Sequence, residues 1–243
     1  MKLMDQEFLT IDVALAKTHK YASRESGDTV ELVERPGGGF SVVMIDGQGS
    51  GKAAKTLSLL LSAKAVGLIK DGVRDGAVAR ATHDFLFAFR HGQVSATLDI
   101  VSVDLQTRDV VITRNADSPM LLRKDGEISV VPMTSGPIGR TKFTRPAIQS
   151  FPAEDGVVLV MFTDGVTHSG LRQQLGPIDY QSLAEEVLGN GFTAQEIADM
   201  VLEFARTRDN NRPGDDTAVI VVAVNSVVQP MAIRRLQASF PVT

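Results

Sequence analysis

The chain has 243 residues, of which 43% are hydrophobic, and a formal net charge of −4 at pH 7. These values are typical of a soluble globular protein with one sizeable core, so we expect a single domain, with two small domains as the alternative. The isoelectric point near 5.6 and the absence of a sustained Lys or Arg run argue against nucleic acid or an anionic membrane as the main partner. The sequence has no cysteine, which excludes disulfides, cysteine-ligated zinc and a thiol nucleophile.

The first residues lack the features of a targeting segment. Residues 1–10 carry Asp5 and Glu7 and have no apolar stretch of the kind found in a signal peptide. The longest apolar runs, such as residues 157–162, are far shorter than the roughly 20 residues that a membrane-spanning helix needs. We therefore expect a cytoplasmic protein.

The first third of the chain predicts strands followed by two helices. Alternating apolar residues predict strands over 10–17 and 29–34, and a continuous apolar run predicts a buried strand over 40–45. The turn of Pro36 and three glycines makes the second and third strands a hairpin that ends at Asp46. Apolar residues at helical spacing then predict two consecutive helices, over residues 52–70 and 76–90.

The remainder predicts a β block, a second helix pair and a last strand. Short strands separated by turns are expected to pair antiparallel, over residues 95–105, 110–115, 120–123, 128–131, 144–151 and 157–163. Helices are expected over 180–188, capped by Asp179, and over 194–207, where Thr193 and Glu196 form a capping box. The last strand is expected over residues 217–224.

This order of elements predicts an α+β protein with sheets inside and helix pairs outside. No internal repeat or low-complexity linker divides the chain, so we expect one domain over residues 1–224. Residues 225–243 have weak periodicity and are expected to be a C-terminal tail.

Four aspartates, each beside a glycine or a turn, are the strongest chemical signal: Asp28, Asp46, Asp164 and Asp215. Carboxylates are hard oxygen ligands that suit Mg²⁺, Mn²⁺ or Ca²⁺, and glycine lets the backbone approach closely. Any one Asp-Gly pair is most simply a hairpin turn. The four together, with the adjacent Asp215 and Asp216, favour a cation site, and their wide separation excludes a single-loop calcium site.

The glycine cluster at residues 46–52 resembles a phosphate-binding loop but does not match one. Lys52 is followed by Ala53 where a P-loop needs Ser or Thr, and Asp46 stands where the first glycine is required. The glycine spacing also fails the dinucleotide-binding pattern. Nucleotide binding here is therefore a weak alternative.

Together these motifs resemble the metal-dependent Ser/Thr protein phosphatases of the PPM superfamily, and more closely its bacterial SpoIIE-like branch. The similarity covers roughly residues 10–224. It lies in Ser26-Gly27-Asp28, in Asp46-Gly47 with Gly49, Gly51, Ala53 and Ala54, in Asn115-Ala116-Asp117-Ser118-Pro119, in Gly136-Pro137-Ile138-Gly139, in Thr163-Asp164-Gly165-Val166 and in Asp215-Asp216-Thr217. This resemblance implies a four-layer α-β-β-α sandwich of two antiparallel sheets flanked by helix pairs.

The resemblance also implies a site that holds two Mn²⁺ or Mg²⁺ ions. Asp46 would bridge the ions, and the Gly47 carbonyl and Asp28 would bind one of them. Asp164 and Asp215 would hold the other, so that Asp46 and Asp164 are the central catalytic ligands. Asp216 would lie outside the ion contacts. In such a site a water activated by the metal attacks phosphorus directly, which suits a chain without cysteine.

Other residues near these motifs depart from the family or have simpler interpretations. Gln48 stands where many PPM enzymes have a proton-donating His, and Arg24 is a speculative substitute for their phosphate-binding arginine. Lys20 is interpreted as a solvated charge, and His168 as a surface histidine. Two further interpretations are structural: residues 115–119 form a turn that shapes the sheet, and Asp99 and Asp104 lie on the solvent face of a strand.

The implied function is hydrolysis of phosphoserine or phosphothreonine on signalling proteins. About 10 residues precede the first predicted strand, so we expect a stand-alone catalytic domain similar to the RsbX-type stressosome feedback phosphatase. The implied partner is then a phosphorylated anti-sigma antagonist or stressosome component, with no role for nucleic acid or membrane. A catalytically weak or inactive PPM-fold module that binds a phosphoprotein is the alternative. The sequence leaves the oligomeric state open.

Overall fold

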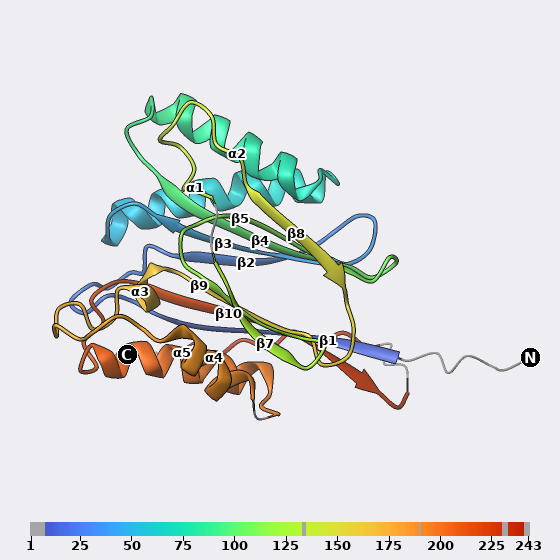
Figure 1. Cartoon of the computed structure of the whole chain (residues 1–243). Coiled ribbons are helices and arrows are strands. Elements are labelled where there is room, and N and C mark those ends of the chain that lie inside the picture. Colours follow the sequence, from blue (N-terminus) through green and yellow to red (C-terminus); the bar gives the residue numbers. More distant parts are fainter. Residues whose placement is uncertain (1–7, 133–134, 190, 230–232, 241–243) are drawn as a thin grey trace, which may run out of the picture.

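Two antiparallel five-stranded sheets pack face to face, and a pair of helices covers the outer side of each sheet (Figure 1). The structure is a computed structural model that describes residues 8–132, 135–189, 191–229 and 233–240. The expected four-layer α-β-β-α sandwich is confirmed. Of the prediction for residues 1–10, residues 1–7 lie outside the described part of the chain, as do tail residues 230–232 and 241–243.

Each sheet combines strands from both halves of the chain. Sheet A has the order β1-β10-β9-β6-β7, with bounds Phe8–Thr18, Thr217–Val227, Val158–Phe162, Met120–Lys124 and Glu127–Val131. Sheet B has the order β2-β3-β4-β5-β8, with bounds Thr29–Glu34, Phe40–Gly47, Ala96–Asp104, Asp109–Asn115 and Ala147–Pro152. Every strand pair is antiparallel, as the even spacing of short strands predicted.

The helices pack as the apolar spacing predicted. Helices α1 (Gly51–Lys70) and α2 (Asp75–Arg90) cover sheet B, whereas α4 (Tyr180–Leu188) and α5 (Ala194–Arg208) cover sheet A (Figure 1). The predicted caps are confirmed, because the Asp179 side chain accepts a hydrogen bond from the Ser182 amide and Thr193 and Glu196 form a capping box. One short helix, α3 (Asp164–Thr167), follows β9 and was not expected.

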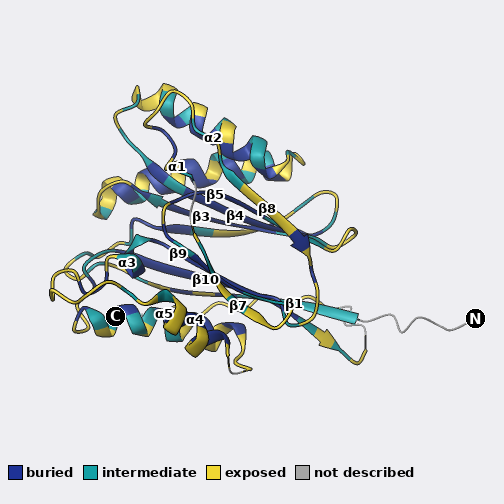
Figure 2. Cartoon of the chain, viewed as in Figure 1, coloured by how far each residue is buried: buried dark blue, intermediate teal, exposed yellow. Residues whose placement is uncertain are grey.

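The core has three layers, one between the sheets and one under each helix pair. In Figure 2 the inner strands are mostly dark blue, the colour of buried residues, and the exposed residues concentrate on the outer faces of the helices and in loops. The layer between the sheets includes Val42, Met44, Val101, Ile220 and Val222. Because β9 and β10 are covered on both faces, their sequences are continuously apolar and do not alternate between apolar and polar residues.

The structure changes two local expectations. Strand β10 runs to Val227, beyond the expected end at residue 224, because it pairs with β1 along its whole length up to Phe8. Residues 233–240 have no regular secondary structure. The interpretation of Asp99 as solvent-facing is wrong. Asp99 is 2% exposed and lies between the sheets, where the Arg114 guanidinium forms an ion pair with it. Asp104, expected on the same solvent face, is partly exposed at the end of β4 and accepts hydrogen bonds from the amides of Gln106 and Thr107.

Candidate metal centre

The four predicted aspartates meet at one end of the sandwich. Thr29 pairs with Ile45 across β2 and β3, so Asp28 and Asp46 lie at the same end of that hairpin. Phe162 pairs with Val219 across β9 and β10, which places Asp164 and Asp215 together at the same end of sheet A. The two pairs are in electrostatic contact, because Asp28, Asp164 and Asp215 all raise the pKa of Asp46. Asp46 in turn acts on the pKa of Asp164.

Two motif glycines permit this convergence by close backbone contact. A Cβ atom on Gly165 would lie 2.1 Å from the Asp216 carbonyl oxygen. A Cβ atom on Gly47 would lie 2.7 Å from the Ala54 carbonyl oxygen in α1. Real Cβ atoms do not approach backbone so closely, so any larger residue would push α3 away from β10 or α1 away from β3. The glycines of the two Asp-Gly pairs are therefore required for close packing at the site as well as for the turns.

Asp28 is the most enclosed of the four carboxylates, with 0% exposure. Its Oδ2 accepts a 2.9 Å hydrogen bond from the Thr163 hydroxyl, whereas its Oδ1 has no hydrogen-bond partner among the described residues. A buried carboxylate oxygen without a partner is costly unless a cation or donor occupies the space beside it. This donor set therefore fits a hard divalent cation.

Electrostatics at the site lead to the same conclusion. Burial, together with the neighbouring Asp216 and Asp164 charges, raises the pKa of Asp28 to about 7 despite the Thr163 hydrogen bond. Burial and repulsion from Asp28, Asp164 and Asp215 raise the pKa of Asp46 to about 9. Burial also raises the pKa of Asp164, against the lowering effect of His168. Several carboxylates held this close together destabilise their own ionised forms, which a bound cation would relieve.

His168 joins the centre and is more than a surface residue. Its backbone amide bonds to the Asp164 carbonyl, and its Nδ1 lies 3.4 Å from Asp164 Oδ2. Ligand atoms of Asp164, His168 and Asp215 all lie within 4.8 Å of one another, close enough to share one ion. The spacing of four residues from Asp164 was visible in the sequence, but the short helix that turns the ring toward Asp164 was not.

Asp216 and three lysines hold the loop that carries Asp28. The Asp216 carboxylate accepts hydrogen bonds from the amides of Lys20 and Gly27, at 2.9 and 2.8 Å. The ammonium groups of Lys17 and Lys55 both donate to the Asp28 carbonyl oxygen. Lys20 is closer to the centre than expected, with its Nζ 3.9 Å from Asp215 Oδ1. The sequence did not reveal Lys17 or Lys55, because no motif marks them.

Gln48 has a structural role and does not act as a proton donor. Its side-chain oxygen accepts a 2.8 Å hydrogen bond from the Ser95 backbone amide, and the Gln48 backbone amide donates to the Ser95 carbonyl. It therefore fixes the start of β4 beside the Asp46 loop. No hydrogen bond or ion pair joins Arg24 to the carboxylates within the described residues.

The turn at residues 115–119 borders the site as well as shaping the sheet. The Ser118 hydroxyl donates to the Phe162 carbonyl at 2.8 Å, directly before Thr163 and Asp164. Ser118 in turn accepts a hydrogen bond from Arg114, whose guanidinium binds Asp99. Asp117 is close enough to raise the pKa of Asp164. This segment links sheet B to the end of β9 where the acidic centre lies.

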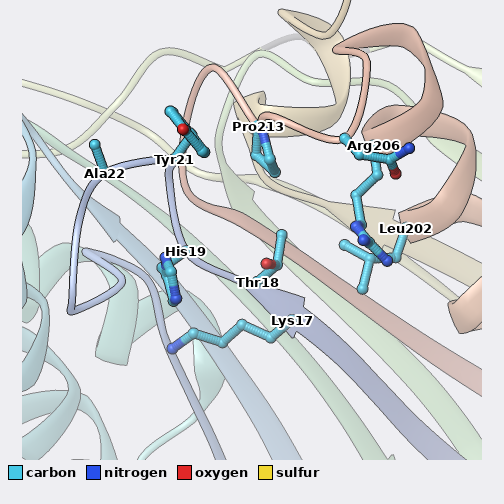
Figure 3. A pocket seen from close by; sticks show the side chains of 9 residues that line it. Lys17, Thr18, His19, Tyr21, Ala22, Leu202, Arg206 and Pro213 are labelled. Carbon is cyan, nitrogen blue, oxygen red and sulfur yellow. The ribbon is translucent and has the colours of Figure 1, made fainter. Parts of the chain in front are cut away.

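A surface cavity of about 420 Å³ lies beside the Asp28 loop (Figure 3). Its lining residues come from the end of β1 and the loop after it, from α5 and from the loop before β10; they include His19, Tyr21, Leu202, Arg206 and Pro213. The Tyr21 amide bonds to the Pro213 carbonyl, which connects this cavity to the segment that carries Asp215. The cavity is thus a neighbour of the acidic centre but contains none of its carboxylates.

Comparisons with known proteins agree with this arrangement. The family described as Stage II sporulation protein E (SpoIIE) matches residues 36–225, more than three quarters of the chain. The chain belongs to the SpoIIE family. A SpoIIE-family relative, Stage II sporulation protein E of Priestia megaterium, is 23% identical over 220 residues, which cover 87% of this chain. The chain spans 36% of that relative's length and 26% of its Bacillus subtilis counterpart's length.

Solved structures show the same fold for this SpoIIE-family chain. The PP2C phosphatase domain of Bacillus subtilis SpoIIE, with a fragment of its regulatory domain, has a TM-score of 0.77 at 20% identity, covering 89% of this chain and 64% of that one. RsbX in complex with magnesium has a TM-score of 0.66 at 14% identity, covering 91% and 97%. The catalytic domain of the phosphatase PstP with two manganese ions has a TM-score of 0.65 at 16% identity, covering 89% and 99%.

By family the chain is thus a SpoIIE-family domain, and its fold is that of the PP2C phosphatase domain of Bacillus subtilis SpoIIE. No helix in the described ranges has the length and apolar character needed to cross a membrane.

Proposed function

We propose that this SpoIIE-family chain is a Mn²⁺- or Mg²⁺-dependent phosphatase that hydrolyses phosphoserine or phosphothreonine on proteins. The observation that carries the proposal is the convergence of Asp28, Asp46, Asp164 and Asp215 from four distant segments, with one buried Asp28 oxygen that has no partner in the described part of the chain. A fold does not assemble mutually repelling carboxylates at a cost in stability unless the set has a use.

The proposed site holds two ions, as the resemblance implied. By the resemblance, Asp46 would be the shared ligand, and the charges of the other three carboxylates act on its pKa. Asp28 and the Gly47 carbonyl serve one ion, and Asp164 and Asp215 serve the other. His168 lies where it adds a nitrogen ligand to the second pair. The magnesium and manganese bound by RsbX and PstP support this choice of metals.

Residues of the chain would position the metal ligands and attract the substrate. Divalent ions held by these residues would supply Lewis acidity and would lower the pKa of a bound water. Thr163 orients the Asp28 carboxylate, and Lys17 and Lys55 hold its carbonyl, so the ligand is preorganised. Lys20, beside Asp215 and partly exposed, is placed to attract the dianionic phosphate.

The substrate class is proposed from the family resemblance. A regulatory phosphoprotein of the anti-sigma antagonist or stressosome kind is the first candidate, and a cytoplasmic location stays a prediction. The alternative is an inactive module that only binds a phosphoprotein. The complete ligand set disfavours it, because a module without catalysis has no need for a buried carboxylate that requires a cation.

The direct test measures phosphate release from p-nitrophenyl phosphate and from a phosphoserine peptide, with MnCl₂ and with EDTA. We expect Mn²⁺-dependent turnover that EDTA abolishes and that Asp46→Asn lowers at least about 100-fold. Asp84→Asn is the matched control, since Asp84 is an exposed carboxylate on α2. Mn²⁺ binding by calorimetry without turnover on either substrate would favour the inactive module instead.

A further inference from the structure

A basic loop stands out in this acidic chain. Residues 128–153 contain no Asp or Glu, although the whole chain has a net charge of −4. Within this stretch Arg140, Lys142 and Arg145 are all exposed. None of the ion pairs found among the described residues involves these three cations. The segment 140–145, here called the basic loop, therefore presents uncompensated positive charge to solvent.

The basic loop projects from a rigid base. Ile138 is fully buried and forms a β-bridge with Ala96. The next amide, of Gly139, donates a 3.1 Å hydrogen bond to Nδ1 of His83, and a Cβ atom on Gly139 would lie 2.3 Å from Leu86. Within the loop the Thr141 hydroxyl bonds to the Phe143 carbonyl and to the Thr144 hydroxyl. The cations thus project from an ordered platform, which lowers the entropy cost of binding a partner.

The base of the loop is joined to both sides of the acidic centre. Ala96 follows Ser95, which is hydrogen-bonded to Gln48, two residues after Asp46. The Asn115 side chain donates to the Gly136 carbonyl, and Asn115 leads to Asp117 beside Asp164. In Figure 1 the loop lies beside the C-terminal end of α2, on the same side of the molecule as α3. The base of the loop is thus connected to residues on both sides of the carboxylates, Gln48 on one side and Asn115 on the other.

The loop also offers a shaped surface. A cavity of about 380 Å³ is lined by Arg140, Thr141, Phe143 and Arg145 together with residues 135–137. The Phe143 ring is 83% exposed, and the Lys142 ammonium lies 5.5 Å from its centre. Arginine and aromatic side chains are the residue types that contribute most to protein interfaces. The combination fits a peptide segment with carboxylates around an apolar residue.

We infer that the basic loop is the docking site for an acidic segment of the protein substrate and selects phosphoproteins whose phosphorylated residue is flanked by Asp or Glu. This inference rests on the proposed phosphatase function and specifies its substrate class. Charge complementarity favours this partner, because a centre lined with carboxylates gains little selectivity for an acidic segment without a separate cationic contact.

The test compares two phosphoserine peptides of the same core, flanked by three Asp or by three Lys on each side. We expect the protein with Mn²⁺ to prefer the acidic peptide by roughly tenfold or more in kcat/KM at low salt, and the preference to shrink as salt screens the contact. Changing Arg140, Lys142 and Arg145 together to Glu should abolish the preference while turnover of p-nitrophenyl phosphate stays unchanged. The matched control changes Lys70, Arg74 and Arg80 to Glu, which alters the net charge equally on exposed positions of the helix layer.

Binding is measured separately, by fluorescence anisotropy of the non-phosphorylated peptides in EDTA. Tighter binding of the acidic peptide that only the loop variant loses supports docking even if no phosphate is released, a result that would reject the proposed function alone. Equal binding and turnover of both peptides, or a loop variant that behaves like the helix control, would overturn the docking proposal.

Discussion

The Thr163 hydroxyl donates a 2.9 Å hydrogen bond to Oδ2 of Asp28, which lies 135 residues earlier in the chain. Thr163 connects β9 to α3 in sheet A, whereas Asp28 precedes β2 in sheet B. The same hydroxyl accepts a 2.9 Å hydrogen bond from the Ala218 amide at the start of β10. One side chain thus links three of the segments that carry proposed metal ligands, and its bond opposes the effect of burial on the pKa of Asp28.

Replacing this hydroxyl should weaken metal binding. In Thr163→Val, the Asp28 carboxylate loses the donor that it has among the described residues and binds its proton more tightly, so we expect Mn²⁺ affinity to fall by roughly 10–100-fold at neutral pH. Thr163→Ser keeps the hydroxyl and should stay near wild type. Titration calorimetry measures both. Wild-type affinity in the valine variant would show that this hydrogen bond does not organise the site.

The stability of the metal-free protein should depend on pH with an unusual sign. Asp28 and Asp46 have pKa values of about 7 and about 9 in the folded state, above the ordinary value of 3.8. The folded state therefore binds more protons than the unfolded state across this range, and the free energy of unfolding falls as pH rises from about 4 to about 9. Urea denaturation in EDTA at a series of pH values measures this slope.

Two controls separate the acidic centre from other titrating groups. Asp46→Asn removes the most shifted carboxyl, so its stability in EDTA should fall less steeply with pH and exceed that of wild type near pH 8. Mn²⁺ should stabilise the wild type more at high pH, where the ligands have lost their protons. A pH slope that is the same in wild type and variant would exclude Asp46 as its source.

The buried pair of Asp99 and Arg114 should be costly to break. The two residues lie opposite each other on β4 and β5, with two 2.9 Å hydrogen bonds between guanidinium and carboxylate. Arg114→Leu leaves Asp99 buried and unpaired, and we expect a loss of about 3–5 kcal/mol in the free energy of unfolding. The double variant with Asp99→Leu should recover much of it. For the exposed pair of Arg206 and Glu203, the same measurement should give less than about 1 kcal/mol.

His168 should influence which metal is preferred. Imidazole nitrogen suits Mn²⁺ better than Mg²⁺, so His168→Gln should weaken Mn²⁺ binding by more than Mg²⁺ binding. With Mn²⁺ bound, electron spin echo spectra of the wild type should show nitrogen coupling that the variant lacks, whereas His19→Gln should retain it. Identical spectra for His168→Gln and wild type would place His168 outside the coordination shell.

Much of the fold could be read from local sequence, because strand alternation, helical spacing and capping residues act over a few positions. The capping box of Thr193 and Glu196 was predicted with its residues, and most element ends differ by a few positions at most. Asp99 was misread for a physical reason: its alternation with apolar neighbours looks the same whether a strand faces solvent or a second sheet. Only the partner Arg114, on the next strand, distinguishes the two cases.

The acidic centre, too, was predictable from the sequence only in part. The sequence by itself determined that Asp28 and Asp46 share the end of one hairpin and that glycines follow Asp46 and Asp164, because turn chemistry is local. Only the packing of sheet on sheet decided that the Asp164 and Asp215 pair meets them, that Thr163 bonds to Asp28, and that burial raises the pKa values. Desolvation and charge repulsion depend on distances across the sandwich, which no short stretch of sequence records.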